Sequence, residues 1–496
     1  MNRLKYFFSL IPILILISLL SINVYIYGDN SLGGPNQLSL LLSGAIAGII
    51  GIKFGCSWKK IINGVSNSIK SVTPAIIILL LIGSLAGTWL ISGIVPAMIY
   101  YGLQILNPEY FLFATAIITA IVSLSTGSSW STIATIGIAL LGIGQALGMS
   151  EGIIGGAIIS GAYFGDKMSP LSDTTNLAPA MSGTNLIVHI KYMMYTTIPS
   201  FVIALVIFLI LGFQTEVNSS QNIDAILSAL SSSFNITPWL FLVPVVVIFL
   251  IVKKVPAIPS LLVGTLLGGI FAIIFQPNII LEITDISADQ INTFNYLFRN
   301  TIFEIKDISK MNIFNAYAGI LNSMSSEINI TTTNKELNSL LSSGGMYGML
   351  NTIWLIICAM IFGGIMEVTG LLKQIAEPII KRAKTCGNLV TTTAGTCIFF
   401  NITASDQYIS IVVPGRMFAD SYKEIGLAPE NLSRTLEDSG TVTSVLIPWN
   451  TCGATQSAVL GVATLAYLPY CFFNLISPVM TISYAYLGIR IKKLGN

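Results

Sequence analysis

The stretch GAYFGDKMSPLSDTTN, residues 161–176, places Asp166, Lys167 and Asp173 on either side of Pro170 in a chain that is otherwise strongly apolar. The chain has 496 residues, of which 53% are hydrophobic and 9% are charged. An ordinary soluble domain contains about 25% charged residues. Because so few charged residues cannot cover a surface that faces water, we expect most of the chain to lie in lipid.

Continuous apolar runs recur along the whole chain, and many approach the roughly 20 residues that cross a bilayer as a helix. Since the runs do not alternate, they favour an all-α polytopic membrane protein over a lipid-embedded barrel. About ten transmembrane helices are expected, at 6–27 (an uncleaved first helix), 38–52, 73–95, 152–182, 194–213, 236–252, 257–276, 347–370, 437–466 and 468–488. Polar residues interrupt the runs 110–148 and 388–414, which we expect to be re-entrant hairpins.

Several classes of protein are disfavoured by the composition. Six scattered cysteines and a single histidine, His189, provide no disulfide framework, histidine metal cluster or catalytic triad. The chain has no GxxxxGK[ST] loop for a nucleotide. It also lacks the GxGD motif of intramembrane aspartyl proteases, because Tyr163 occupies the position of the first glycine. We therefore expect no enzyme, no cofactor and no nucleic-acid partner.

The distribution of basic residues predicts the topology. The short segments 28–37, 96–109, 149–151, 214–235 and 467 contain no lysine or arginine, whereas the loops assigned to the other face contain many. By the positive-inside bias, the basic face is cytoplasmic. We then expect the chain to lie in a bacterial cytoplasmic membrane with both termini on the cytoplasmic side. The predicted organisation is a first membrane repeat (1–213), an external linker (214–235) and a second repeat (236–490) with a polar external insertion (277–346).

The two halves then have opposite orientations, which predicts inverted-topology repeats with broken helices. The first hairpin contains STGSSWST (125–132) and the second NITASDQYIS (401–410), and we align Ser128 with Ser405, so that Ser129 faces Asp406. Polar residues follow Pro170 and Pro448 at nearly equal distances from the hairpins. A proline breaks a helix, and within a membrane such breaks are tolerated only where protein or a water-filled cavity satisfies the freed backbone.

Broken helices of this kind form ion sites in transporters built from inverted repeats. A charged side chain at a helix centre costs about 2.5–3.5 kcal/mol, and burial disfavours the ionised carboxylate, so a proton and a cation can compete for it. We expect one site built from Asp173, Thr174, Asn176, Ser405 and Asp406, with transient Na⁺ at Asp173 and Asp406. Asp166 would brace this site or relay protons. The remaining candidate cation or proton ligands are Ser128, Asn401, Thr403 and Asn450.

Structural interpretations compete with these assignments. Asp166 or Lys167 could form an ion pair with another helix, and Asp173 could cap a half-helix. Glu437 and Asp438 are interpreted as first-turn residues of the helix 437–466, favoured there by the helix dipole. Outside the site, His189 is expected in a surface loop, and Trp130 and Trp449 could only pack.

The stretch 161–186 and the segments NITASDQY and LSRTLEDSGTVTSVLIPWNTCGATQSAVLGV resemble the NhaC-type sodium/proton antiporter family of the ion-transporter superfamily. The resemblance extends over nearly the whole chain and implies inverted repeats with two re-entrant hairpins. It implies a secondary transporter that exchanges Na⁺ for H⁺. Independently of the resemblance, a homodimer is a possible assembly. The alternative within the family is a sodium- and proton-coupled carboxylate exchanger of the malate/lactate type.

Overall fold

The structure is a computed structural model that describes residues 3–27, 31, 33–105, 107–214, 220–253, 255–284, 313–332, 337–338, 341–380 and 385–494. Among these residues, eight helices are long and apolar enough to cross a membrane, or up to ten if each of two strongly bent helix pairs forms one span. The all-α polytopic fold with broken helices is therefore confirmed. The insertion predicted at 277–346 lies partly outside the described residues.

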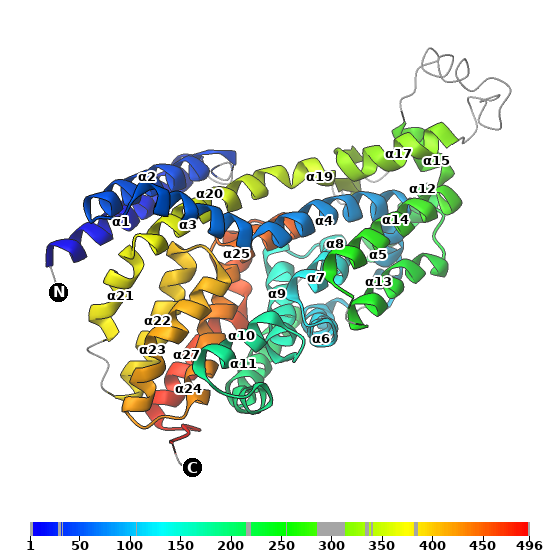
Figure 1. Ribbon diagram of the computed structural model, residues 1–496. Coiled ribbons are helices and arrows are strands. Elements are labelled where there is room, and N and C mark those ends of the chain that lie inside the picture. Colours follow the sequence, from blue (N-terminus) through cyan, green and yellow to red (C-terminus); the bar gives the residue numbers. More distant parts are fainter. Residues whose placement is uncertain are drawn as a thin grey trace.

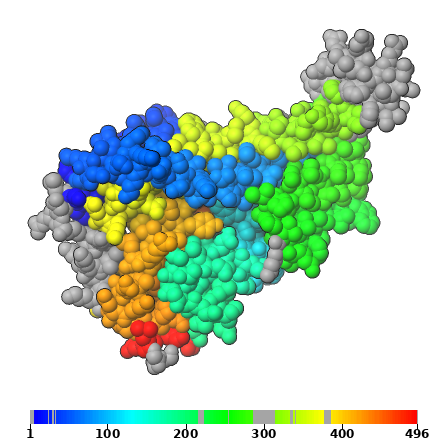
Figure 2. Space-filling view, in the orientation of Figure 1, coloured from blue at the N-terminus to red at the C-terminus, as the bar shows by residue number. Residues whose placement is uncertain are grey.

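One group of helices forms an upper layer of the molecule in the view of Figure 1. It contains α1 (Arg3–Tyr27), α2 (Pro35–Lys53), α3 (Trp58–Ser71), α4 (Thr73–Ile91), α17 (Ile313–Ser325), α19 (Gly345–Gly348) and α20 (Leu350–Val368). Helix α21 (Leu371–Ile380) runs down from this layer at the left of the view. In this layer α20 packs against α2 and α3. Figure 2 shows the blue and yellow segments of this layer as one band above the orange and teal helices.

A second group lies at one end of the molecule, to the right in Figure 1. It comprises α5 (Ile94–Ile105), α12 (Ser220–Ser233), η3 (Pro238–Phe241), α13 (Leu242–Val252), α14 (Ala257–Phe275) and α15 (Pro277–Ile283). The stretch expected as an external linker thus contains a helix, α12. Two short antiparallel strands, β1 (Ile328–Asn329) and β2 (Ser342–Ser343), pair Ile328 with Ser343.

Helix α14 illustrates how the apolar helices separate a lipid face from a packing face. Leu262, Leu266 and Ile270 are exposed, and their spacing places them on one side of the helix. Gly264 and Gly268 are buried at the contact with α4, where an added Cβ at either position would come within 3 Å of an α4 side chain. The exposed apolar row is the surface expected of a helix in contact with lipid.

The remaining helices form two units in which the same order of elements occurs twice. The first unit is α6 (Pro108–Thr126), α7 (Ser129–Thr132), η2 (Ile133–Gly137), α8 (Ile138–Ala146), α9 (Glu151–Met168), α10 (Asp173–Ser182) and α11 (Leu186–Gln214). The second is α22 (Cys386–Thr403), α23 (Gln407–Glu424), α24 (Pro429–Leu436), η4 (Glu437–Thr441), η5 (Ser444–Leu446), α25 (Thr451–Leu460), α26 (Thr464–Tyr467), η6 (Leu468–Tyr470) and α27 (Phe472–Leu487). Each unit is a helical hairpin, a broken helix and a further long helix.

Glycine backbone contacts fix the position of α9. A Cβ at Gly161 would lie 2.1 Å from the Ala116 carbonyl oxygen, and one at Gly165 would lie 2.5 Å from the Ala120 carbonyl oxygen. These two glycines, four residues apart, let α9 pack directly on the backbone of α6, as small residues do between membrane helices. The contact fixes the end of α9 that carries Asp166 and Lys167.

The helix expected at 437–466 starts earlier and is broken. It begins at Pro429, continues as the π-helical segment η4 and stops before Asn450, where α25 follows. The prediction that Glu437 and Asp438 lie in a first turn is therefore wrong, because both lie within a continuous helical stretch and are fully buried. Burial is possible for Asp438 because partners from other helices contact its carboxylate.

Candidate functional site

Four half-helices begin next to one another in the interior, one at each hairpin tip and one at each helix break. Their N-cap side chains accept hydrogen bonds from backbone N–H groups in the first turn. Ser128 accepts from Ser131 at 3.2 Å, Ser172 from Thr175 at 3.5 Å, Asp406 from Ile409 at 2.9 Å and Asn450 from Cys452 at 3.0 Å. The polar stretches of the sequence are therefore helix starts inside the protein.

The caps also correct the alignment of the two hairpins. Gly127 and Ser405 have positive φ values of 71° and 59°, and each immediately precedes the N-cap of the second arm. Ser128 thus corresponds to Asp406, and our alignment of Ser128 with Ser405 is wrong by one residue. The sequence favoured the wrong alignment because Ser128 and Ser405 are both serines. Only the backbone conformation shows which residue of each hairpin forms the turn.

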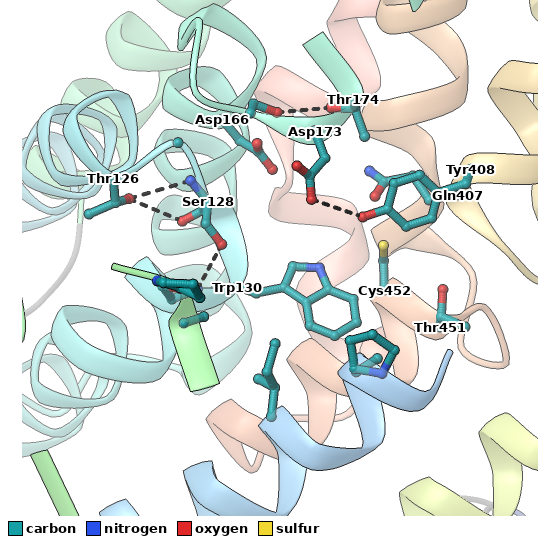
Figure 3. Close-up of a pocket in the computed structure, with 18 of the residues that line it drawn as sticks. Thr126, Ser128, Trp130, Asp166, Asp173, Thr174, Gln407, Tyr408, Thr451 and Cys452 are labelled. Atoms are coloured by element: carbon teal, nitrogen blue, oxygen red, sulfur yellow. Dashed lines mark hydrogen bonds between the residues drawn. The ribbon is translucent and has the colours of Figure 1, made fainter. Parts of the chain in front are cut away.

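A cavity of about 650 Å³ lies between the two hairpins and the two broken helices. Its lining includes the predicted site residues Ser128, Asp166, Asp173, Thr174 and Asp406. Residues of α3, α4 and the connection between α13 and α14 complete the wall. In Figure 3 the carboxylates of Asp166 and Asp173 lie between Ser128 and Tyr408.

The three aspartates of the cavity differ in their surroundings. Asp166 is buried and accepts a hydrogen bond from the Ser129 hydroxyl at 2.7 Å. Asp406 is buried at the hairpin tip, where its carboxylate caps α23. Asp173 is exposed, and its Oδ2 accepts a 3.4 Å hydrogen bond from Tyr408. Because Ser172 is the N-cap, Asp173 is a first-turn residue and not the cap.

The Tyr408–Asp173 hydrogen bond joins the hairpin of the second unit to the broken helix of the first, and α10 packs along α23. This is the meeting of the two units that the sequence predicts. Because the two units meet here, carboxylates of both line one cavity. Asp166 and Asp173 belong to the first unit and Asp406 to the second.

Three lining residues that we did not predict from the sequence share one position with the predicted residue Thr174. Trp130, Tyr408 and Cys452 each lie two residues after an N-cap, as the predicted residue Thr174 does, and all four side chains line the cavity. Gln407 and Thr451, one residue after a cap, line it too. The capping residues in the sequence provide the signal that could have identified them. Trp130 therefore lines the site, whereas Trp449 donates to the Ile402 carbonyl at 2.8 Å.

The other predicted ligands do not line the cavity. Asn450 donates to the Asn401 carbonyl oxygen at 3.0 Å, and Asn401 donates to the Gly440 carbonyl oxygen at 2.8 Å, so this pair ties the broken helix to the hairpin. Thr403 bonds to its own helix at Phe399, and Ser405 turns the hairpin tip. Asn176 donates to the Pro170 and Ser172 carbonyl oxygens at the break.

Lys167 forms the ion pair with another helix that the sequence raised as an alternative. Its ammonium contacts the Asp438 carboxylate, and both side chains are fully buried. Ser477 accepts from Lys167 at 3.0 Å and donates to Asp438 at 3.3 Å, while Thr196 donates to Asp438 at 2.8 Å. The pair satisfies its hydrogen bonds locally, as a buried ion pair must to offset desolvation.

Two further polar side chains, those of His189 and Arg434, are buried. His189 lies in α11, with its Nδ1 2.8 Å from the Ser433 hydroxyl, so its assignment to a surface loop is wrong. Arg434 donates to the Arg490 carbonyl oxygen at 3.2 Å and stacks 4.7 Å from the centre of the Tyr192 ring. Tertiary packing of α11 and α24 covers both.

The cavity has the charge of a cation site. Its described lining contains three aspartates and no lysine or arginine. The four helix N-termini also favour negative charge nearby. Within the described part of the chain, no group of three or more histidine, cysteine, aspartate or glutamate side chains is arranged to hold a metal ion.

Comparisons with known proteins show the family to which the chain belongs. Residues 161–289 and 293–489 match the Na+/H+ antiporter family. The chain is 37% identical over 457 residues to the Na(+)/H(+) antiporter NhaC of Alkalihalophilus pseudofirmus, covering 92% of this chain and 91% of the relative. It is 36% identical over 476 residues to the malate-2H(+)/Na(+)-lactate antiporter of Bacillus subtilis, covering 93% of each. It is also 34% identical over 489 residues to the arginine/ornithine antiporter ArcD of Halobacterium salinarum, covering 97% of this chain and 92% of the relative.

Proposed function

Since the chain belongs to the Na+/H+ antiporter family, we propose that it exchanges sodium for protons across the cytoplasmic membrane as a secondary transporter. The observation that carries the proposal is the cavity in which Asp166 and Asp173 of one unit face Asp406 of the other. A carboxylate-rich cavity without a cationic lining residue attracts a cation and repels an anion.

In this mechanism Asp173 and Asp406 bind sodium, and Thr174 supplies a hydroxyl oxygen from the same wall. A buried carboxylate is costly when it is charged and unpaired. The buried Asp406 therefore takes up either a proton or the sodium ion, and the two compete for one site. Ser129 holds Asp166 next to this site, where Asp166 braces the ligands or passes protons.

The inverted orientation of the two units supports alternating access, in which one unit moves against the other around the shared site. The cavity wall includes Ser71 and Ala257, which adjoin loops on the lysine-rich face of the molecule. By the positive-inside bias this face is cytoplasmic. We therefore propose that this conformation is open towards the cytoplasm, with both termini on that side.

A second candidate is exchange of an organic carboxylate coupled to sodium and protons. The size of the cavity favours it, because about 650 Å³ is the volume of a small-molecule site rather than that of a bare ion. Paired helix N-termini could bind a carboxylate group in place of an arginine. The three aspartates oppose this binding unless sodium or protons neutralise them first.

Everted membrane vesicles separate the two candidates. Respiration acidifies the vesicle interior, and a fluorescent amine reports the pH gradient. Added NaCl should dissipate the gradient in vesicles that contain the protein, whereas choline chloride should not. Vesicles without the protein serve as the control for leakage.

A response to sodium that requires malate or lactate on the opposite side would favour the carboxylate exchanger. A response to arginine or ornithine without sodium would assign an amino-acid substrate instead. No response to sodium under any of these conditions would contradict sodium/proton exchange.

A further inference from the structure

Glu437 is a carboxyl group in the membrane interior that the proposed sodium site does not use. Its side chain is fully buried, and among the described residues neither carboxylate oxygen has a hydrogen-bond partner. It lies in η4, the π-helical segment that continues α24 from Glu437 to Thr441. Such segments are rare and frequently occur at functional sites.

The surrounding charges leave Glu437 without a counter-ion. The charged groups that act on it most strongly are Lys167 and Asp166 on α9 and the neighbouring Asp438. Lys167 is already paired with Asp438, so its charge is neutralised. Arg434, one turn earlier, is directed towards the Arg490 carbonyl oxygen and the Tyr192 ring.

Helix α24 also carries the buried Glu430, which is paired with Lys492, and the other helices packed against η4 supply no buried charge. Helices α22 and α27 contain no charged residue, and α10 carries only Asp173 in its exposed first turn. The charged residues of α23 (Arg416, Asp420, Lys423 and Glu424) are all exposed. The buried titratable side chains Cys397 on α22 and Tyr422 on α23 are neutral groups at physiological pH.

A fully buried carboxyl group without a cationic partner is stable only in its neutral form. We propose that Glu437 is a second proton-binding site of the transporter, separate from the sodium cavity, and that it gives up its proton when sodium binds. This inference rests on the proposed sodium/proton exchange.

The coupling follows from charge. Asp166 lines the sodium cavity and also acts electrostatically on Glu437, while Lys167, the next residue, pairs with Asp438 beside Glu437. A sodium ion at the cavity carboxylates adds positive charge to this region and so favours the ionised form of Glu437. By linkage, loss of the Glu437 proton strengthens sodium binding by the same factor.

Isothermal titration calorimetry tests the inference on the purified full-length protein in detergent. Titrations of NaCl in buffers with different ionisation enthalpies give the number of protons released for each sodium ion bound. Glu437→Gln keeps the shape of the neutral acid but cannot release a proton. Linkage predicts that it releases about one proton fewer per sodium ion than the wild type.

Two variants serve as controls. Glu430→Gln alters another buried glutamate of the same helical stretch, whose Oε1 pairs with Lys492 at 2.8 Å, and should leave the proton number unchanged. Glu437→Asp keeps a carboxyl group and should release as many protons as the wild type. An equal loss in Glu437→Asp or Glu430→Gln would overturn the assignment, because the effect would then come from packing.

Release of the wild-type number of protons by Glu437→Gln would also overturn the inference. So would failure of Glu437→Gln to fold, because glutamine replaces a neutral acid without adding or removing charge. If the wild type binds sodium without releasing any proton, the proposed function fails and not the role of Glu437 alone.

Discussion

At the scale of single residues, the interior of this protein contains charges whose roles depend on their partners. Lys167 and Asp438 neutralise each other, whereas the cavity aspartates have no cationic partner within the described lining. The first arrangement stabilises a structure, and the second leaves negative charge available to a transported cation. Two adjacent residues thus differ in role, since Asp166 lines the cavity and Lys167 forms the buried ion pair.

Removal of one partner of the buried pair should be strongly destabilising. Asp438→Asn leaves the Lys167 ammonium unpaired among buried groups, which typically costs about 3–5 kcal/mol. The control is Lys492→Met, which removes the partly exposed partner of Glu430 and should cost less than Asp438→Asn, because solvent still reaches this pair. Thermal unfolding followed by the loss of monodisperse protein measures both.

The double variant Lys167→Met/Asp438→Asn should recover part of the stability lost in Asp438→Asn, because it removes the unpaired charge. A melting temperature of Asp438→Asn equal to that of the wild type would show that the pair does not hold these helices together.

At the scale of helices, close backbone contacts position the cavity residues. Gly165 precedes Asp166 directly and lies against the backbone of α6, so the position of the carboxylate depends on a contact that only glycine allows. The four N-caps also position residues of the cavity, because each fixes where a half-helix begins after a hairpin tip or a helix break.

Addition of a single methyl group tests the contact between α6 and α9. Gly165→Ala places a Cβ 2.5 Å from the Ala120 carbonyl oxygen, and overpacking of this kind costs about 1–3 kcal/mol. Gly395→Ala, in α22, adds a methyl group with no neighbouring atom within 4 Å. We expect a lower melting temperature and weaker sodium exchange for Gly165→Ala only. Equal behaviour of the two variants would exclude a tight contact at Gly165.

The sequence predicts these helices better than it predicts their surroundings. The hairpins and the break near Pro170 follow from polar residues in apolar runs, because few structures tolerate them in a membrane. The alignment of the hairpins failed because Gly127 and Ser405 adopt the same backbone conformation without sharing a side chain. Burial of His189 and Glu437 was missed because charged residues near the ends of apolar runs resemble surface residues until α11 and η4 are packed.

At the scale of the whole molecule, the proposed alternating access requires two units that cross the membrane in opposite orientations. The repeated order of elements supports two units, and the charge distribution predicts their opposite orientation. With opposite orientations, the cavity opens to one face of the membrane at a time. Helices α3 and α12 then lie on opposite sides of the membrane.

Cysteine labelling tests this topology. In a variant without the native cysteines, Lys60→Cys should react with a membrane-impermeant maleimide only in everted vesicles, and Ala225→Cys only in right-side-out cells. Both positions are exposed in the structure, so accessibility within the protein does not limit the reaction. Labelling of both cysteines from the same side would be incompatible with inverted repeats.

The central claim is that one carboxylate cavity shared by the two units exchanges sodium for protons. The most direct measurement compares Asp406→Asn with Asp420→Asn, an exposed aspartate of the same helix, by the rate at which NaCl dissipates the pH gradient in everted vesicles. Asparagine keeps the hydrogen bond that caps α23 and removes the titratable charge. Equal amounts of inserted protein are confirmed by immunoblot. We predict that Asp406→Asn abolishes exchange while Asp420→Asn retains the wild-type rate. Exchange by Asp406→Asn at the wild-type rate, with unchanged dependence on sodium concentration, would contradict the shared site.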